Sequence, residues 1–293
     1  MIHNFIKVGI NPNWIEVVWA TDSDPSQEVL AMAPKHATVR FFIYNKRVHS
    51  SHGYIPILRP DALEQHFSRF PELSNDVVFY HDSDIIFKEL PDFDSMRDDE
   101  YWYLSDTASY IGAKYIKSKS NELFEDMCRI ADIDPTLVEN NEAFSGGAQY
   151  LMKSVTADYW KYVKETALSL YKYMADREEA ERKTIDPESL KTYNPIQKWC
   201  SDMWAVLWGA WRIGSQVKLH KDLEFSWGTS SLTDYERHKI MHNAGVTGNQ
   251  DGRLFYKGEF INRDPFTADF SKIDPNTASA KYVEAILYAK QHR

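Results

Sequence analysis

Cysteine is scarce in this chain, and positive charge is not in excess. The two cysteines, Cys128 and Cys200, lie far apart and lack the spacing of a metal site. A disulfide scaffold is therefore not expected, and a reducing compartment is favoured. Lysine and arginine number 34 against 43 acidic residues, which gives a formal net charge of −9. This balance argues against broad binding to nucleic acid or to membrane surfaces, because both require a basic footprint.

Long apolar runs are missing as well. No stretch approaches the roughly 18 apolar residues that cross a bilayer. Residues 1–7 carry no basic region followed by an apolar run, so no secretion signal is predicted. We therefore expect a cytoplasmic protein without a transmembrane segment. The 293 residues, 43% of them hydrophobic, suffice to bury a sizeable core.

Short apolar runs alternate with helical segments in the first half of the chain. Strands are predicted at 15–20, 38–44, 76–80 and 101–104, and helices at 61–70 and 114–133. Strands without polar alternation are typical of a sheet covered on both faces, so an α/β fold is predicted. Further helices are predicted at 155–181, 195–211 and 278–291, and the charged stretch 176–189 is interpreted as a solvated helix end and loop.

The sharpest feature follows the strand predicted at 76–80. Asp82-Ser83-Asp84 comes directly after it, and the apolar run 85–87 follows. Ligands of open α/β sheets bind at the carboxyl edge of the strands, where these aspartates are expected. Carboxylate oxygens suit Mg²⁺ or Mn²⁺, and such a cation would bridge to a diphosphate that the acidic site otherwise repels. The alternative is an acidic turn that merely ends the strand.

Three further segments carry candidate site residues. Gly146 and Gly147 form a glycine pair that allows close backbone approach, without the spacing of a phosphate-binding loop. His242 precedes a glycine-containing turn, and its imidazole is interpreted either as a metal ligand or as a structural group. Asp202 lies in an aromatic helix, where an unpaired acid is costly to bury. It is interpreted as a cleft carboxylate or as a helix-end residue.

In this order the segments resemble the nucleotide-sugar-dependent glycosyltransferases of the GT-A fold. Asp82-Ser83-Asp84 matches the Asp-x-Asp signature of that family, and residues 145–149 match its glycine loop. Ser201-Asp202 matches its later acidic motif, with serine in place of the usual glutamate, and His242 matches its C-terminal metal-binding histidine. The resemblance spans about residues 15–246. It implies a Rossmann-like sheet, mixed but mainly parallel, flanked by helices in one domain.

Within that single domain of residues 1–293, the resemblance implies a nucleotide-binding half over about 1–110, an acceptor-binding half over about 111–246 and a tail over 247–293. Asp82, Asp84 and His242 would hold Mn²⁺ or Mg²⁺ against the diphosphate of a nucleotide sugar, with a UDP-sugar favoured. Asp202 would be the general base if the reaction inverts, and would only position the acceptor if the reaction retains.

The family also implies contacts to the donor and the acceptor, which is a glycan or another hydroxyl-bearing molecule. Gly146 and Gly147 would lie under the donor sugar or the acceptor. Further donor contacts are implied for Thr21 and Asp22 (nucleoside), Arg59 (base or phosphate) and Asp106 (sugar hydroxyls). Loop and cap roles are the alternative for these residues. Trp227, in a predicted loop, is the favoured residue for stacking on the acceptor, whereas Trp204 and Trp208 continue a helix stripe that favours core packing.

Two other functions stay open. A sugar-phosphate nucleotidyltransferase shares the sheet type, but it normally carries a glycine-rich basic signature after the first strand, where residues 20–25 here read Ala-Thr-Asp-Ser-Asp-Pro. A non-catalytic carbohydrate-binding protein on a transferase scaffold is the second. The presence of both aspartates and His242 argues against it.

Overall fold

The strands in the described part of the chain form three short sheets. The computed structural model describes residues 1–21, 24–25, 27, 30–31, 36–47, 53–248, 250–261 and 263–292. The first sheet pairs β1 (Glu16–Thr21) with β2 (Arg40–Asn45). The second has the order β3-β6-β5-β7, made of β3 (Val77–His81), β6 (Gly146–Lys153), β5 (Trp102–Asp106) and β7 (Val217–Leu219). The third has the order β4-β9-β8, made of β4 (Ile85–Phe87), β9 (Ile240–His242) and β8 (Phe225–Trp227).

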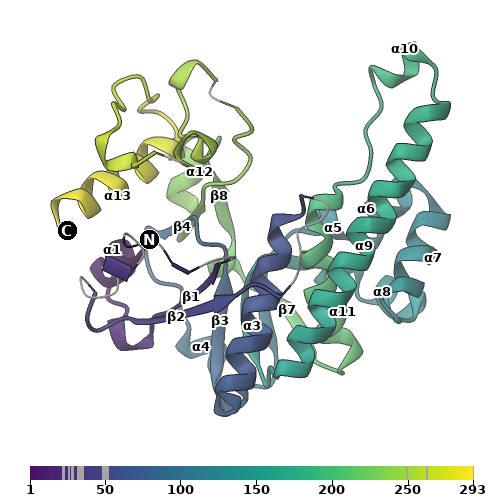
Figure 1. The fold of residues 1–293 in the computed structure, drawn as a ribbon, viewed down its shortest axis with the longest axis horizontal. Helices are drawn as coiled ribbons and strands as arrows, with labels where there is room; N and C mark the ends of the chain where they lie inside the picture. Colours follow the sequence, from purple (N-terminus) through teal and green to yellow (C-terminus); the bar gives the residue numbers. More distant parts are fainter. Residues whose placement is uncertain are drawn as a thin grey trace.

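The second and third sheets are mixed, and the expectation of mainly parallel pairing is wrong for the described residues. The pairs β1–β2, β5–β7 and β8–β9 are parallel, whereas β3–β6, β5–β6 and β4–β9 are antiparallel. The main cause is β6, which lies between β3 and β5 and runs opposite to both. Residues 145–149 were predicted to form a glycine loop, so this strand was not predicted. The α/β class itself is confirmed, with helices flanking mixed sheets (Figure 1).

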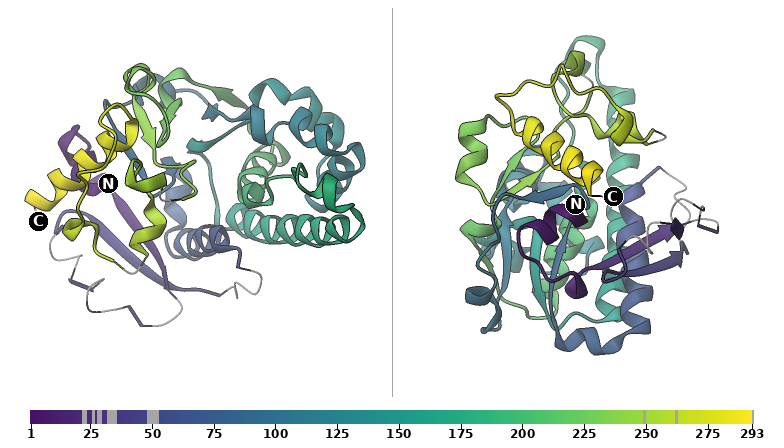
Figure 2. Two further views of the ribbon diagram at one scale, coloured as in Figure 1. Left: turned by 90° about the horizontal axis from the view of Figure 1, so that it is seen from above. Right: turned by 90° about the vertical axis from the view of Figure 1, so that its left-hand side faces the viewer.

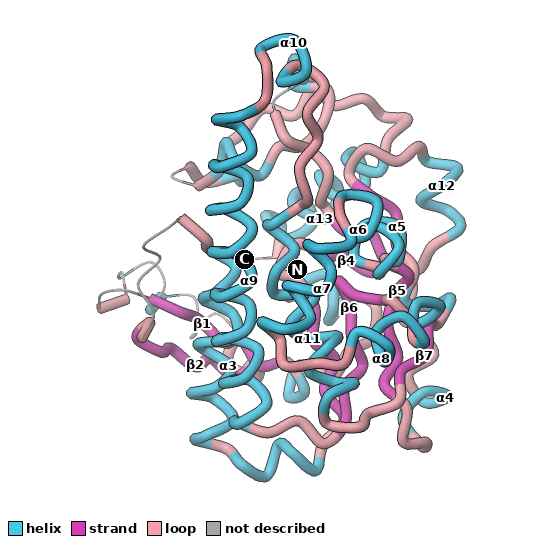
Figure 3. Tube along the Cα trace, turned by 90° about the vertical axis from the view of Figure 1, so that its right-hand side faces the viewer, coloured by secondary structure: helices cyan, strands magenta, loops and turns pink. Residues whose placement is uncertain are grey.

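The longest helix organises the second half of the chain. α9 (Ala157–Thr184) packs against α3 (Leu58–Arg69) and α11 (Ser201–Arg212), and the three lie side by side in Figure 3. Its far end projects beyond the sheets and leads to α10 (Pro187–Leu190) (Figure 1). The other α-helices described are α1 (Ile2–Lys7), α4 (Asp94–Arg97), α5 (Ala108–Ile111), α6 (Ala113–Lys119), α7 (Asn121–Ile130), α8 (Pro135–Asn140), α12 (Leu232–Arg237) and α13 (Ala278–Gln291).

Short 3₁₀ turns connect many of these elements. They are η1 (Pro12–Trp14), η2 (Ile55–Ile57), η3 (Pro71–Asn75), η4 (Glu142–Phe144), η5 (Lys198–Cys200), η6 (Lys221–Leu223), η7 (Gln250–Gly252), η8 (Lys257–Phe260) and η9 (Pro265–Thr267). The two ends of the chain meet, because α1 contacts α13 (Figure 2). Among the described residues, no helix has both the length and the apolar character needed to cross a membrane.

Local sequence explains where the helices differ from their predicted bounds. α3 begins at Leu58 rather than after Pro60, because a proline in the first turn of a helix gives up no intrahelical hydrogen bond. The predicted helix over 114–133 is divided at Ser120, whose hydroxyl accepts the N–H of Leu123 at 3.4 Å and starts α7. Because α3 begins earlier than predicted, Arg59 lies in the first turn of the helix.

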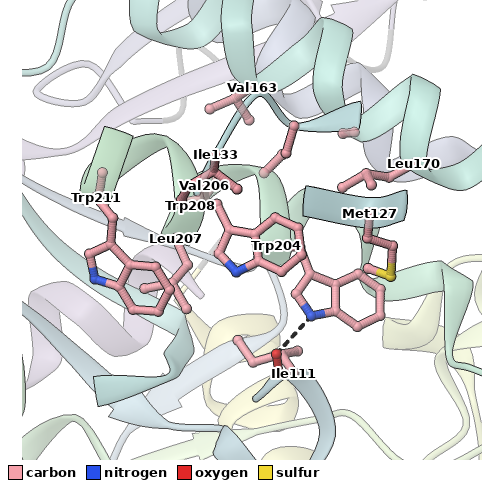
Figure 4. Close-up of a cluster of buried hydrophobic side chains, with 14 of the residues drawn as sticks. Ile111, Met127, Ile133, Val163, Leu170, Trp204, Val206, Leu207, Trp208 and Trp211 are labelled. Atoms are coloured by element: carbon pink, nitrogen blue, oxygen red, sulfur yellow. Dashed lines mark hydrogen bonds between the residues drawn. The ribbon is translucent and has the colours of Figure 1, made fainter. Parts of the chain in front are cut away.

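The main core lies between α9, α11 and the four-stranded sheet. Trp204 and Trp208 are 0% and 1% exposed and pack among apolar side chains (Figure 4). The indole N–H of Trp204 donates to the carbonyl of Ile111 at 2.8 Å. Both tryptophans therefore belong to the core, as the helix stripe predicted, and neither is available for stacking on an acceptor.

Candidate metal centre

The turn between β3 and β4 carries Asp82 and Asp84. The β4–β9 ladder places Ile85 opposite His242, which comes from a distant segment of the chain. The N–H of Asn243 donates to the carbonyl of Asp84 at 3.0 Å, which continues this pairing beyond the strand. Strand pairing therefore delivers a histidine from a distant segment to the two aspartates.

These three side chains form one cluster. Nε2 of His242 lies 3.2 Å from Oδ2 of Asp82 and 3.2 Å from Oδ1 of Asp84. One ligand atom from each residue lies within 4.8 Å of the other two. Nδ1 of His242 is buried and has no hydrogen-bond partner in the described part of the chain, so the polar contacts of the ring are made by Nε2. Two carboxylate oxygens and an imidazole nitrogen at this separation fit a divalent cation such as Mn²⁺.

Lys257 lies on the outer side of Asp84. Its Nζ is 2.5 Å from Oδ2 of Asp84, the oxygen that does not face His242. Burial alone would raise the pKa of Asp84, but the hydrogen bond and charge of His242 and the charge of Lys257 outweigh it and lower this pKa to about 2. Asp84 is therefore ionised at neutral pH, as a cation ligand must be.

Arg59 occupies the corresponding place beside Asp82. Its guanidinium forms an ion pair with Oδ1 of Asp82 through one nitrogen and with Oδ2 of Asp202 through another. The hydroxyl of Tyr54 donates to Oδ1 of Asp202 at 3.0 Å, and the N–H of Asp202 donates back to the Tyr54 oxygen at 2.8 Å. Burial and the charge of Asp202 raise the pKa of Tyr54, so its hydroxyl keeps its proton at neutral pH. Asp202 is thus connected to the cluster through one arginine.

The glycine pair acts by close packing rather than through positive φ. A Cβ on Gly146 would come within 2.6 Å of the Ser105 carbonyl oxygen, and one on Gly147 within 2.5 Å of the Met203 side chain. The positive φ in this segment, 63°, belongs to Ala148, where the β5–β6 register shifts at a bulge. Bulges re-aim the side chains beside them and are frequent at functional sites. The expected glycine loop is therefore the tightly packed start of β6.

The nucleoside and sugar contacts implied by the resemblance fall on Thr21, Asp22 and Asp106. Thr21 ends β1, and its carbonyl accepts the N–H of Lys46 at 2.7 Å. Asp22 lies outside the described residues. The carboxylate of Asp106 accepts the N–H of Ala108, two residues later, at 3.0 Å, which is a local turn contact before α5.

Two tryptophan rings contact residues of this region. Trp227 ends β8 rather than lying in a loop, because β8 pairs with β9 and aligns Trp227 with His242. Its ring is nearly parallel to that of His242, with centroids 6.4 Å apart. Trp199 is 51% exposed, and its ring meets that of Tyr54 edge-on at 5.6 Å.

Sequence reasoning missed three of these residues. Lys257 lies in a tail without a recognisable motif, and Tyr54 belongs to no pattern that marks a site. Trp199 is distinguished from Trp204 and Trp208 by its exposure, which the sequence does not show. Comparison of the chain with models of protein families, with curated proteins and with solved structures finds no match in any of the three.

Proposed function

We propose that the chain is a metal-dependent glycosyltransferase with a GT-A-like fold, which transfers a sugar from a nucleotide-diphosphate sugar to a glycan or another hydroxyl-bearing acceptor. The observation that carries this proposal is the Asp82–Asp84–His242 cluster with one basic side chain on each outer side. A cation site flanked by Arg59 and Lys257 suits a diphosphate, which needs positive charge on several of its oxygens.

The charges favour a joint site for cation and diphosphate. Asp82 and Asp84 would repel a diphosphate in a chain that already carries a formal net charge of −9. A divalent cation between them neutralises the two carboxylates, and Arg59 and Lys257 then add positive charge at hydrogen-bonding distance from the same carboxylates. We therefore expect donor binding to depend on the cation.

The chain's own residues supply orientation and charge in this reaction. Asp82, Asp84 and His242 would hold the cation, which acts as a Lewis acid on the departing diphosphate. Lys257 stabilises the same developing negative charge, and its 57% exposed side chain is free to follow the diphosphate. Trp227, beside His242, and Trp199, beside Tyr54, offer apolar faces on which an acceptor sugar would stack.

The test is a thermal-shift screen of nucleotide sugars with and without Mn²⁺, followed by donor hydrolysis assays. A donor present at 100 times its dissociation constant stabilises the native state by about 2.7 kcal/mol, so the correct donor should stand out, and only with the cation. We expect Asp84→Asn to reduce Mn²⁺-dependent hydrolysis of this donor by about 100-fold or more, because Lewis-acid stabilisation amounts to several kcal/mol.

A matched control is Asp99→Asn. Slight burial acts to raise the pKa of Asp99, but hydrogen bonds from Tyr103 and Lys153 lower it to about 2, as for Asp84, while Asp99 lies outside the cluster. This variant should keep the cation-dependent reaction. A rate of donor hydrolysis that does not depend on Mn²⁺, or that is unchanged in Asp84→Asn, would contradict the proposal. Release of pyrophosphate from a nucleoside triphosphate and a sugar phosphate would instead indicate a nucleotidyltransferase.

A further inference from the structure

Asp202 is enclosed by partners that leave it no access to an acceptor. Its side chain is 4% exposed. One carboxylate oxygen is paired with Arg59, and the other accepts the hydroxyl of Tyr54 at 3.0 Å. A general base must reach the proton that it removes within hydrogen-bonding distance. Here both oxygens already have partners from the protein, and the side chain has little exposure through which an acceptor could reach them.

The same contacts connect Asp202 to the cation ligands. Arg59 pairs with Oδ1 of Asp82, and the remaining oxygen of Asp82, Oδ2, lies 3.2 Å from Nε2 of His242. Arg59 thereby determines which oxygen of Asp82 faces Asp84 and His242. The planar guanidinium can contact two carboxylates only if both lie at the correct angle. Asp202 is the second of the two carboxylates, and its contact fixes the orientation of the Arg59 guanidinium.

Tyr54 in turn fixes Asp202. Its ring stacks on that of Tyr171, with centroids 4.3 Å apart and 17° between the planes, and Tyr54 is 1% exposed. Its oxygen both donates to the carboxylate and accepts the backbone N–H of Asp202. The order of contacts is therefore Tyr54, Asp202, Arg59, Asp82, from the core to the cluster.

We propose that Asp202 is a positioning residue that holds Arg59 against Asp82 and so orients Asp82 for the cation, rather than the general base of the reaction. This inference rests on the proposed function, because it assumes that Asp82 is a cation ligand. Asp202 also cancels the positive charge of Arg59. If Asp202 is neutralised, the arginine charge next to Asp82 is no longer balanced and opposes a divalent cation.

The experiment measures Mn²⁺ binding to the full chain without nucleotide, from the signal of free Mn²⁺ in electron paramagnetic resonance. We expect Asp202→Asn to weaken Mn²⁺ binding by about tenfold, since loss of a residue that orients a metal ligand typically costs 10–100-fold in affinity. Tyr54→Phe should weaken it less, in the same direction. In an Arg59→Met background, Asp202→Asn should change Mn²⁺ affinity by less than about twofold, because the connection to Asp82 is already lost.

A kinetic measurement separates positioning from base catalysis. At saturating Mn²⁺ and donor, Asp202→Asn should recover most of the transfer rate, because the defect lies in cation binding. Unchanged Mn²⁺ affinity together with transfer that stays lost at saturation would identify a general base and overturn the inference. If Asp202→Asn does not fold, Tyr54→Phe decides: unchanged Mn²⁺ affinity in that variant overturns the inference as well.

The matched control is Asp222→Asn. Asp222 is a buried carboxylate paired with Lys239 at 2.9 Å, and it is not part of the cluster. This variant loses a comparable ion pair and should keep Mn²⁺ affinity unchanged. If the wild-type chain binds no Mn²⁺, the proposed function fails and the inference fails with it, whereas normal wild-type binding with no effect of Asp202→Asn refutes the inference alone.

Discussion

The two ends of one short segment, from η5 through α11, lie in opposite surroundings. At its start, Trp199 is half exposed and Asp202 contacts Arg59 and Tyr54. Within the next two turns, Trp204 and Trp208 are enclosed by the apolar side chains of α9 and its neighbours (Figure 4). Exposure, rather than residue type, therefore decides whether an aromatic ring of this segment can meet a ligand.

The physical basis of each end is different. Apolar burial and close packing stabilise the tryptophan-rich end, and they act without regard to direction. The charged end depends on oriented pairs, in which each carboxylate oxygen has a designated partner. Substitutions at the tryptophan-rich end should therefore reduce the free energy of unfolding, and substitutions at the charged end should change ligand binding.

The largest effect is expected at the enclosed end. Trp204→Ala removes a fully buried ring and leaves the Ile111 carbonyl without its donor. Truncations of this kind cost about 3–5 kcal/mol of unfolding free energy. Urea denaturation followed by circular dichroism measures the loss, and Trp204→Phe should lose less. A loss below about 1 kcal/mol would mean that this end is not held by packing.

An intermediate effect is expected at the exposed end. Trp199→Ala should raise the KM for a glycan acceptor by about tenfold, which corresponds to about 1.4 kcal/mol of lost stacking. Donor hydrolysis without acceptor should stay unchanged, and so should stability within about 0.5 kcal/mol. Trp14→Ala is the control, because Trp14 is 76% exposed and belongs to η1 rather than to the η5–α11 segment. An unchanged acceptor KM would remove Trp199 from the acceptor site.

The smallest effect is expected where charge pairs are exposed and serve no ligand. Lys183 pairs with Glu179 one turn earlier in α9, and both side chains are about 70% exposed, at 70% and 69%. Exposed pairs of this kind contribute about 0.5 kcal/mol or less. Lys183→Ala should therefore shift the denaturation midpoint only slightly and leave Mn²⁺ binding intact. A larger loss of unfolding free energy would show that the Lys183–Glu179 pair contributes to stability beyond an ordinary exposed ion pair.

Much of the framework was predictable from local sequence. β1, β2, β3 and β5 lie within two residues of their predicted bounds, because each is a β-branched or aromatic run of five or six residues. β4, β7, β8 and β9 were not predicted as strands, because three residues carry too little pattern to separate a strand from a loop. β6 was missed because its start, Gly146-Gly147, has the composition of a turn.

For the candidate site, sequence reasoning found the three residues that the structure groups together. It predicted Asp82, Asp84 and His242 as a set, on motif order, and they lie in one cluster. Lys257 and Tyr54 were not predicted as site residues. Asp202 was predicted as the general base of an inverting reaction, and we propose a positioning role for it instead because both of its carboxylate oxygens have partners in the protein. These outcomes depend on contacts between residues far apart in the chain, which no local pattern encodes.

The α/β class, the strand that ends at the aspartates and the acidic balance of the chain were predictable from the sequence alone. These properties follow from residue types and from their spacing within one element. Only the tertiary structure decided that β4 and β9 pair to bring His242 to Asp84, that Arg59 connects Asp82 with Asp202, and that Trp204 is enclosed while Trp199 is not. Pairing, orientation and burial are properties of the assembled chain, because each depends on atoms contributed by distant segments.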